Sequence, residues 1–399
     1  MKKILLLTTI YPAPDLKYVT PCVHYFTKEW VKMGYEVKVI HYQAIYPRFF
    51  YLLAKLFRDL IASKTGAVVF TKREKADKHY IMEDVTVYRL PIFKRIPHGG
   101  YTKNVIQKQV AKIIQLNRDD DFTPDIVIGH FSNPQLEIVN ELKKIYKART
   151  CIIMHDDGSS IKRIYKHNYL SYMNSVDTWG FRSMPIKRKF EENFGRQKNS
   201  FLCYSGIPEN YIATQNNRTF SGNINMFVYV GEFIVRKHPV ALIDAVYEVY
   251  PEDDYQISYI GNGAEITNIK HVITSYKIEN KVSLLGFMPR KEILNILDKS
   301  DCFVMISSGE TFGLVYLEAM GRGCLTIGSK NEGIDGVIRH GYNGFLCEAG
   351  NASELSAVIK HINSLTPSER KQISINAINT VKELTDFNAA KEYITSVDY

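Results

Sequence analysis

The sequence lacks the features of several protein classes. No stretch of its 399 residues approaches the roughly 18–20 consecutive apolar residues of a membrane-spanning helix, which excludes an integral helical membrane protein. Cysteine is scarce, and its six residues form no CxxC pair and have no histidine at zinc-site spacing. We also find no short repeat of the solenoid kind. We therefore expect six reduced, mostly buried thiols in a cytoplasmic protein.

The amino-acid composition and the charge distribution further limit the class of protein and its possible partners. Apolar residues make up 45% of the chain and charged residues 23%, which excludes wholesale disorder. The start, MKKILLLTTIYPAP, is basic, but its apolar run is too short for a signal-peptide core, so we expect a buried strand. The formal charge is +9, with 34 basic and 19 acidic side chains in residues 1–200 against 17 and 23 in the remainder. The basic half predicts an anionic partner, with a merely solubilising surface as the alternative.

Alternating apolar strands and amphipathic helices predict the fold class. The first half has expected strands at 2–12, 36–42, 125–131 and 150–156, and the pattern restarts at 226–233. This alternation predicts an α/β protein with two doubly wound, Rossmann-like parallel-sheet domains, whose ligands bind at the carboxyl ends of the strands. We expect an N-terminal domain at 1–212, a C-terminal domain at 213–385, and a C-terminal helix at 386–399 that packs back on the N-terminal domain.

The segment from Ser307 to Leu346 carries the most informative pattern. A buried strand runs into a polar turn, and a helix is expected to start near Gly313, where backbone N–H groups and the helix dipole favour an anion. Glu310 in the turn and Glu318 in the helix add two carboxylates. A sugar nucleotide offers both a diphosphate and hydroxyls to such a site. A loop role for Glu310 and a solvated helix role for Glu318 are the alternatives.

In combination this segment resembles the signature of retaining glycosyltransferases of family 4, S-x-x-E-x-F-G-x-x-x-x-E-A-M-A-x-G-x-P-V-I. The matching residues are Ser307, Glu310, Phe312, Gly313, Glu318, Ala319, Met320 and Gly323. The resemblance extends over most of the chain, through Gly231, Lys237, Gly261, Gly263, Gly286, Phe287, Met288 and, in the first half, His155. Several positions depart from the family: its diphosphate-contacting arginine is Glu232, and its Gly-Gly loop is replaced by Tyr18 to Cys22. In its G-G-x-x-E-x-I motif the first glycine is Glu332 and the glutamate is Gly336.

The resemblance implies the GT-B fold, in which two Rossmann-like domains face each other across an interdomain cleft. It implies transfer of a hexose from a nucleotide diphosphate sugar with retention of configuration, without a metal or other cofactor. A UDP-sugar is the favoured donor and GDP-mannose the alternative. The implied catalytic residues are Glu310, His155, Lys237 and Arg236. The implied donor-binding residues are Glu318, Gly313, Phe312, Leu314, Thr311, Gly231, Gly263, Phe287 and Met288.

Residues 46–63, YPRFFYLLAKLFRDLIAS, combine aromatic, leucine and basic side chains. Such a helix can lie in an anionic membrane interface, and a core-packing helix is the alternative. With the basic loop at 93–104, this predicts peripheral attachment to the inner face of the cell membrane and a lipid-linked or saccharide acceptor of surface polysaccharide synthesis. The predicted acceptor and membrane residues are His130, Arg48, Phe49, Phe50, Lys55, Arg58, Lys94 and Arg95.

Three other functions are alternatives to a transferase. A nucleotide-sugar 2-epimerase shares the fold but does not normally combine these motifs. A non-catalytic partner of a glycosyltransferase would explain Glu232 and the altered first loop. Nucleic-acid binding would explain the basic charge, but the sequence shows no recognised nucleic-acid motif, so we expect no nucleic-acid partner.

Overall fold

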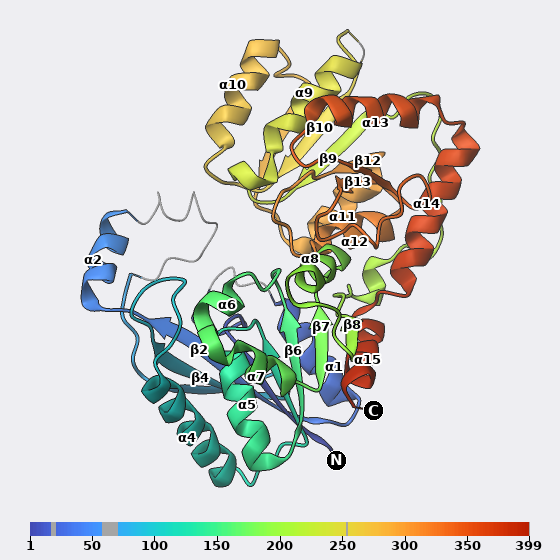
Figure 1. Cartoon of the computed structure of the whole chain (residues 1–399). Coiled ribbons are helices and arrows are strands. Elements are labelled where there is room, and N and C mark those ends of the chain that lie inside the picture. Colours follow the sequence, from blue (N-terminus) through green and yellow to red (C-terminus); the bar gives the residue numbers. More distant parts are fainter. Residues whose placement is uncertain (17–20, 58–70, 253, 399) are drawn as a thin grey trace. The chain divides into compact units, whose positions relative to one another are not determined.

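The computed structural model describes residues 1–399 apart from 17–20, 58–70, 253 and 399. The described residues form two compact units (Figure 1). Within those limits the first unit comprises residues 1–57, 71–205 and 386–398, and the second comprises 206–385. All six cysteines are buried and unbonded, as the sequence predicts. Among the described helices, none combines the length and the apolarity that crossing a membrane requires.

A mostly parallel sheet organises the first unit. Its described strands lie in the order β3-β4-β2-β1-β5-β6-β7-β8, and only β3 and β4 pair antiparallel. The strands are β1 (Lys3–Thr8), β2 (Glu36–Ile45), β3 (Lys78–Met82), β4 (Val85–Phe93), β5 (Ile126–His130), β6 (Arg149–Met154), β7 (Thr178–Phe181) and β8 (Ser200–Leu202). The strand predictions for the first half correspond to β1, β2, β5 and β6.

Side chains of β1 enter two different cores because successive residues of a strand point to opposite faces. Leu5 and Leu7 belong to one buried cluster, whereas Ile4 and Leu6 belong to the other. Each such side chain gains about 1.5–3 kcal/mol on burial. A strand covered on both faces reads as a continuous apolar run, which is why KILLLT is recognisable in the sequence.

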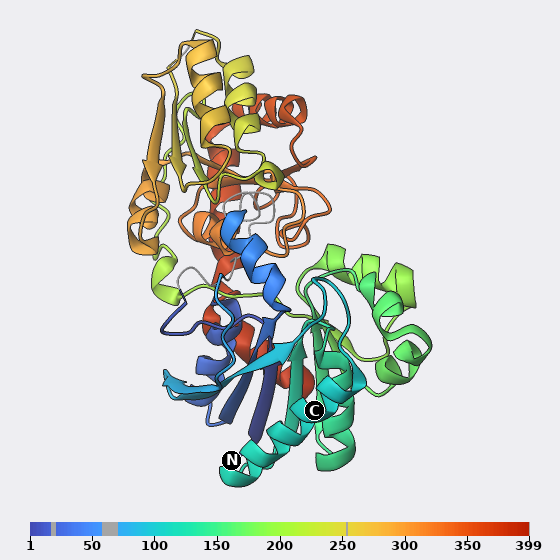
Figure 2. The same cartoon turned by 90° about the vertical axis from the view of Figure 1, so that its left-hand side faces the viewer.

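Helices cover both faces of this sheet (Figures 1 and 2). Helices α4 and α5 supply residues to the cluster that contains Leu5, while α1 and α15 supply residues to the cluster that contains Ile4. The helices of the first unit are α1 (Cys22–Lys32), α2 (Arg48–Leu56), α4 (Lys103–Asp119), α5 (Gln135–Tyr146), α6 (Ser160–Tyr165), η1 (Lys166–Asn168), α7 (Tyr169–Asn174), α8 (Met184–Phe194) and α15 (Asp386–Val397).

The C-terminal helix α15 lies beside α1 (Figures 1 and 2). Its buried residues recur every three to four positions and include Ala390 and Tyr393. The indole N–H of Trp30, in α1, donates a hydrogen bond to the carbonyl oxygen of Ala390 at 2.9 Å. The last described residues of the chain therefore complete the core of the first unit.

The second unit contains a parallel sheet whose described strands lie in the order β11-β10-β9-β12-β13-β14. The strands are β9 (Met226–Val230), β10 (Gln256–Ile260), β11 (Val282–Gly286), β12 (Cys302–Val304), β13 (Leu325–Ser329) and β14 (Phe345–Cys347). The helices are η2 (Glu209–Tyr211), η3 (Val235–Lys237), α9 (Pro239–Val249), α10 (Ile266–Tyr276), α11 (Arg290–Lys299), α12 (Leu314–Gly321), α13 (Ala352–Ser364) and α14 (Pro367–Lys382). The prediction of two Rossmann-like parallel-sheet domains is confirmed.

Candidate functional site

The loops after β9 and β12 form the centre of the candidate site in the second unit. These strands are neighbours, so their carboxyl ends lie at the same edge of the sheet. A hydrogen bond of 2.7 Å from the backbone N–H of Ser308 to the carbonyl oxygen of Arg236 ties the two loops together. His238 adds a second tie, because its Nε2 lies 3.1 Å from Oγ of Ser308.

An ion pair between Lys237 and Glu310 joins the two predicted catalytic positions of this unit. The Lys237 ammonium contacts Oε2 of Glu310 directly, and the Arg236 guanidinium lies 3.9 Å from the same oxygen. The Lys237 and Glu310 side chains are only 12% and 14% exposed, so water screens the pair incompletely. The structure thus brings together three residues that the sequence predicted to act together.

Glu332 also belongs to this group, although its sequence context did not indicate a functional role. Its Oε2 accepts a hydrogen bond of 2.9 Å from the backbone N–H of Glu310. Gly333, the next residue, lies so close to Phe312 that an added Cβ would meet the backbone nitrogen at 2.4 Å. The loop that follows β13 therefore fixes the turn that carries Glu310. The only signal in the sequence was that Glu332 occupies a family glycine position.

Gly313 caps helix α12 in the left-handed conformation, with φ of 83°. No side chain of the described residues caps this end, so the first turn leaves backbone N–H groups for an anion. Phe312 is buried, while Thr311 and Leu314 are half-buried on either side. This turn therefore combines a partial positive charge with the Lys237–Glu310 pair.

The structure places Glu318 in an ion pair with Arg290, the first residue of α11. Glu318 is 4% exposed, and burial raises the pKa of its carboxyl despite the nearby guanidinium. The guanidinium also lies over the ring of Tyr211, 4.9 Å from its centroid. Sequence reasoning missed Arg290 because nothing local links it to a residue in another helix.

Glycines after β9 and β10 let two loops approach closely. A Cβ on Gly261 would lie 1.9 Å from the carbonyl oxygen of Gly231, and one on Gly263 would lie 2.3 Å from that of Phe233. Phe287 is 73% exposed and Met288 is half-buried after β11. Apart from Leu314 and Glu318, which lie in α12, the predicted donor-binding residues therefore occupy the loops at the carboxyl ends of β9, β10, β11 and β12.

Histidines at two strand ends form the corresponding polar group of the first unit. His130 ends β5 and His155 follows β6, and Nδ1 of His130 lies 3.0 Å from Nε2 of His155. The ring of Phe131 stacks on His155 at a centroid distance of 3.9 Å. Burial holds the pKa of both imidazoles well below the usual range, with smaller contributions from His130 on His155 and from the Arg182 charge on both, which favours their neutral forms.

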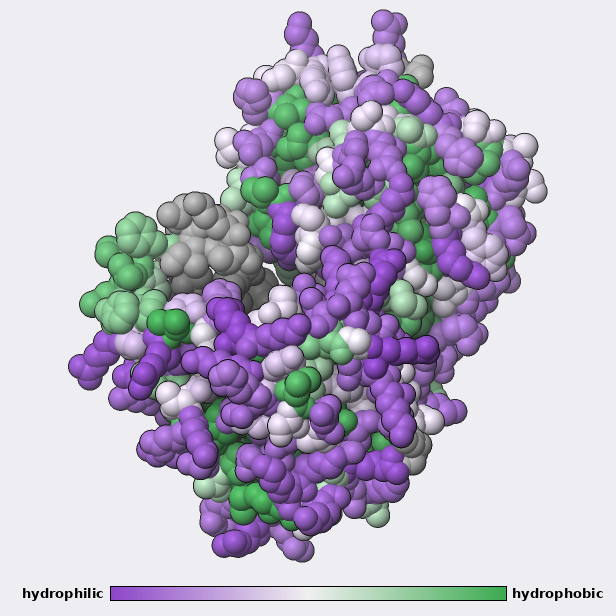
Figure 3. Space-filling view, in the orientation of Figure 1, coloured by the Kyte–Doolittle hydropathy of each residue, from purple (hydrophilic) through white to green (hydrophobic). Residues whose placement is uncertain are grey.

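Helix α2 presents an apolar surface at the edge of the first unit (Figure 3). Only Tyr51 and Ala54 of this helix are buried. The exposed apolar residues are Phe49, Leu52, Leu53, Leu56 and Phe57. Phe50 is half-buried against Phe49 and Tyr46, while Arg48 and Lys55 are exposed. Arg58, also predicted to contact the membrane, lies outside the described residues.

The basic loop after β4 and the segment that leads into α2 follow two neighbouring strands of the sheet. Ile45 of β2 pairs with Phe93 of β4, and the backbone N–H of Lys94 donates to the carbonyl oxygen of Ile45 at 2.8 Å. Lys94 is half-buried with its ammonium 5.2 Å from the Tyr101 ring centroid, whereas Arg95 is exposed. Both segments therefore leave the same end of adjacent strands.

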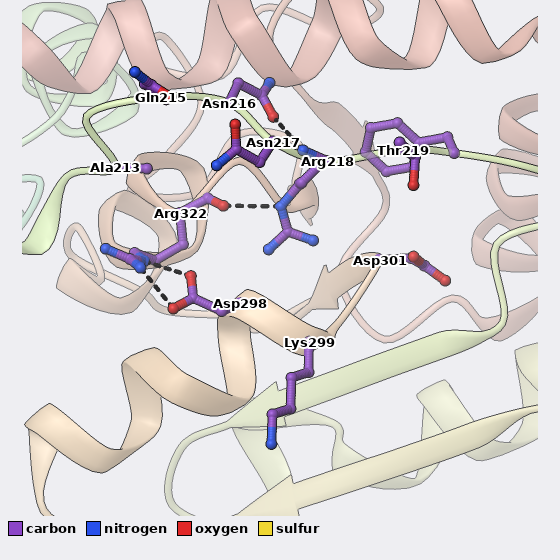
Figure 4. Close-up of a pocket in the computed structure, with 11 residues that line it drawn as sticks. Ala213, Gln215, Asn216, Asn217, Arg218, Thr219, Asp298, Lys299, Asp301 and Arg322 are labelled. Atoms are coloured by element: carbon purple, nitrogen blue, oxygen red, sulfur yellow. Dashed lines mark hydrogen bonds and ion pairs between the residues drawn. The ribbon is translucent and has the colours of Figure 1, made fainter.

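A separate polar cavity of about 460 Å³ lies in the second unit (Figure 4). Its two arginines already have partners: Arg218 donates to the carbonyl oxygens of Arg322, Ser300 and Leu297. Arg322 in turn forms a bidentate pair with Asp298. These contacts anchor the segment that leads into β9 and give the cavity a structural role. Among the residues that the structure describes, the cavity included, no group of three His, Cys, Asp or Glu side chains is arranged to hold a metal ion.

Residues 213–380 match the family model described as "Glycosyl transferases group 1". A 128-residue stretch is 32% identical to N-acetyl-alpha-D-glucosaminyl L-malate synthase of Bacillus anthracis, covering 32% of this chain and 33% of that protein. An uncharacterised glycosyltransferase of Methanocaldococcus jannaschii is 24% identical over 277 residues, 68% of this chain and 75% of the relative. The lipopolysaccharide core biosynthesis glycosyltransferase LpsD of Rhizobium meliloti is 29% identical over 155 residues, 39% and 43% of the two chains. The chain thus spans about a third of the length of the first of these relatives.

The crystal structure of Anabaena HepE in complex with UDP superposes over the full length of both chains, with a TM-score of 0.68 and 18% identity. This likeness covers both units and confirms the predicted GT-B fold class. The second unit carries the sequence pattern of group 1 glycosyl transferases, on a fold that the whole chain shares with solved glycosyltransferases.

Proposed function

We propose that the protein transfers a hexose from a nucleotide diphosphate sugar with retention of configuration. The observation that carries this proposal is the Lys237–Glu310 pair beside the uncapped start of α12, inside the segment that matches the family model. Lys237, Arg236 and the first N–H groups of α12 would stabilise the charge that develops on the departing diphosphate. This role needs no metal ion.

The carboxylates would bind hydroxyl groups of the donor. Glu310 would orient the transferred sugar, and Glu318 would meet the ribose while paired with Arg290. Neither carboxylate acts as a covalent nucleophile in this scheme, so the paired-carboxylate chemistry of glycoside hydrolases does not apply. The resemblance to family 4 supports the further prediction that His155 contacts the transferred sugar.

A UDP-sugar is the first donor to test, because the solved HepE structure, which shares the fold, contains UDP. GDP-mannose is the alternative. A nucleotide present at about 100 times its dissociation constant would stabilise the folded protein by about 2.7 kcal/mol. The experiment measures thermal unfolding with UDP, GDP, CDP and ADP, each at about 1 mM, followed by incubation with the matching nucleotide sugar.

Lys237→Ala should lose the stabilisation by nucleotide. Lys360→Ala is the matched control, since Lys360 forms an exposed ion pair with Glu248 elsewhere in the same unit. Stabilisation by one nucleotide in the parent and the control, but not in Lys237→Ala, supports the donor site. No stabilisation by any nucleotide contradicts it and favours the non-catalytic binding partner.

The apolar surface of α2 supports a second part of the proposal, peripheral attachment to the inner face of an anionic membrane. Leu56 is 77% exposed and Leu52 is 64% exposed, and Arg48, Lys55 and Arg95 supply positive charge around them. A membrane position would give access to a lipid-linked saccharide acceptor. The relative LpsD, named for lipopolysaccharide core biosynthesis, supports surface polysaccharide as the acceptor class.

Sedimentation with liposomes tests the membrane attachment. The variant Phe49→Ser/Leu52→Ser/Leu56→Ser should bind vesicles that contain anionic lipid at least about tenfold more weakly than the parent, because each side chain loses apolar burial. A matched control replaces exposed apolar residues of the second unit, Val235→Ser and Phe287→Ser. Equal binding by parent and α2 variant, or no binding by the parent, overturns the attachment.

A further inference from the structure

Tyr393 of the C-terminal helix reaches the histidine pair of the first unit. Its hydroxyl oxygen lies 3.2 Å from Nε2 of His130, whose Nδ1 lies 3.0 Å from Nε2 of His155. The three side chains form one chain of hydrogen bonds from α15 through the end of β5 to the end of β6. Tyr393 lies outside the segment that matches the family model and outside every motif of the sequence.

The hydroxyl group of Tyr393 has a fixed position. The residue is 1% exposed, and its ring packs edge-on against Phe26 and Trp30 at centroid distances of 5.1 and 4.9 Å. Trp30 also holds the backbone of α15 through its hydrogen bond to Ala390. Rotation of the tyrosine side chain away from His130 would require this aromatic cluster to repack.

The ring of His155 is held by a different contact. Phe131 has a positive φ of 72°, an uncommon conformation for a bulky residue. Its ring stacks on His155 with an interplanar angle of 20°. Stacking restrains the plane of the imidazole but does not determine which nitrogen carries the proton. The hydrogen bond between His155 and His130, together with the one between His130 and Tyr393, decides which nitrogen carries it.

A neutral imidazole has one N–H and one bare nitrogen, so the chain can run in two directions. In the first, Tyr393 donates to Nε2 of His130, Nδ1–H of His130 donates to Nε2 of His155, and His155 carries its proton on Nδ1. In the second, every proton is reversed and the hydroxyl of Tyr393 becomes an acceptor. Its own proton then has no acceptor among the described residues.

We propose that Tyr393 is a positioning residue that fixes the tautomer of His155 through His130. A buried hydroxyl proton without an acceptor is costly, which favours the first direction by about fivefold or more. His155 then presents Nδ1–H as a donor to a ligand. The contact with a ligand rests on the proposed function, in which the sugar or the phosphate offers an acceptor oxygen. The assignment of the tautomer does not depend on that function.

Nitrogen-15 solid-state NMR of the full chain, labelled at its 11 histidines and free of ligand, measures the tautomer directly. His130→Gln and His155→Gln assign the two rings by loss of their signals. In the parent protein both rings should be protonated on Nδ1 and bare on Nε2. Tyr393→Phe removes one hydroxyl and should raise the ratio of the Nε2-protonated to the Nδ1-protonated form of His155 at least about fivefold.

Tyr165→Phe is the matched control, because that buried hydroxyl of the same unit donates to the carbonyl oxygen of Ser132 at 2.6 Å instead of to a histidine. It should leave both histidine spectra unchanged. A proton on Nε2 of His155 in the parent, an unchanged His155 in Tyr393→Phe, or an equal change in Tyr165→Phe overturns the proposal. Because no nucleotide or sugar is present, failure of the proposed function leaves this result unaffected.

Discussion

The two units place different kinds of polar group at the carboxyl ends of their strands. In the second unit, Lys237 and Glu310 are both charged and paired in a half-buried position. In the first unit, His130 and His155 are neutral and joined by a hydrogen bond. Burial disfavours a charge that has no partner, so a deep site keeps the neutral form, whereas a shallower site retains charge through pairing.

This contrast also separates what each region can do for a ligand. The charged group of the second unit suits a diphosphate, whose charge it can balance. The neutral histidines suit a hydroxyl or an oxygen acceptor, and their direction of donation depends on a third residue, Tyr393. Three experiments test whether the distinction between a charged and a neutral site holds.

The largest effect is expected when the charged site loses its carboxylate. Glu310→Ala should lower the rate of sugar transfer by about 100-fold or more, because it removes the group that orients the sugar and leaves Lys237 unpaired. Thermal unfolding checks that the variant is folded. Glu248→Ala, which breaks the exposed pair with Lys360, is the control and should retain full activity. Full activity of Glu310→Ala would contradict the site assignment.

A smaller effect is expected from Arg290→Ala, which isolates a buried carboxyl group. Glu318 already has a raised pKa, and without Arg290 that pKa should rise further. A raised folded-state pKa favours folding at low pH, and stability is lost as the pH rises through it. The variant should therefore lose about 3 kcal/mol of unfolding free energy at pH 8 but clearly less at pH 5.

Urea unfolding of Arg290→Ala at both pH values measures this difference. Arg322→Ala is the matched control, because its partner Asp298 is 39% exposed and the pair is worth at most about 1 kcal/mol. A loss for Arg290→Ala that is equal at pH 5 and pH 8 would show that Glu318 does not titrate as a buried group.

The smallest effect is expected at the neutral histidine site of the first unit. It changes how steeply the free energy of unfolding depends on pH. The folded-state pKa of His130 lies well below that of an unfolded histidine, near 6.5. As the pH falls below about 6.5 the unfolded chain takes up the proton first, so stability decreases on acidification. Each such histidine contributes up to about 1.4 kcal/mol per pH unit.

His130→Gln should therefore flatten the loss of unfolding free energy between pH 6.5 and pH 5, whatever its effect at pH 7. His271→Gln, in an exposed position of the second unit, should keep the parent slope. An identical slope in the parent and in His130→Gln would mean that the buried histidine is not held neutral.

Much of the fold could be predicted because its core strands are locally recognisable. The runs KILLLT and MFVYV are apolar on both faces and became β1 and β9. In contrast, the sequence did not predict β3, which lies at the edge of the sheet. Only alternate residues of its sequence, KHYIM, are partly buried. Edge strands carry half the apolar signal of central ones, so periodicity identifies them poorly.

The candidate site divides in the same way. Glu310, Gly313 and Lys237 were predictable because they belong to compact motifs next to strands. Glu332, Arg290 and Tyr393 were not, because each acts through a contact with a residue distant in sequence. No local pattern indicates that a helix starting at residue 386 will supply a hydroxyl group to a histidine at residue 130.

The sequence by itself determined the class of this protein: alternating strand and helix periods, a reduced cysteine set, and a motif in which carboxylates flank the start of a helix. These features depend on residue type and spacing, which the chain states directly. Only the tertiary structure decided which charges pair, which histidines are neutral and what orients them. Those properties depend on burial and on contacts between distant segments, and both arise only when the strands have assembled into a sheet and the helices have packed against it.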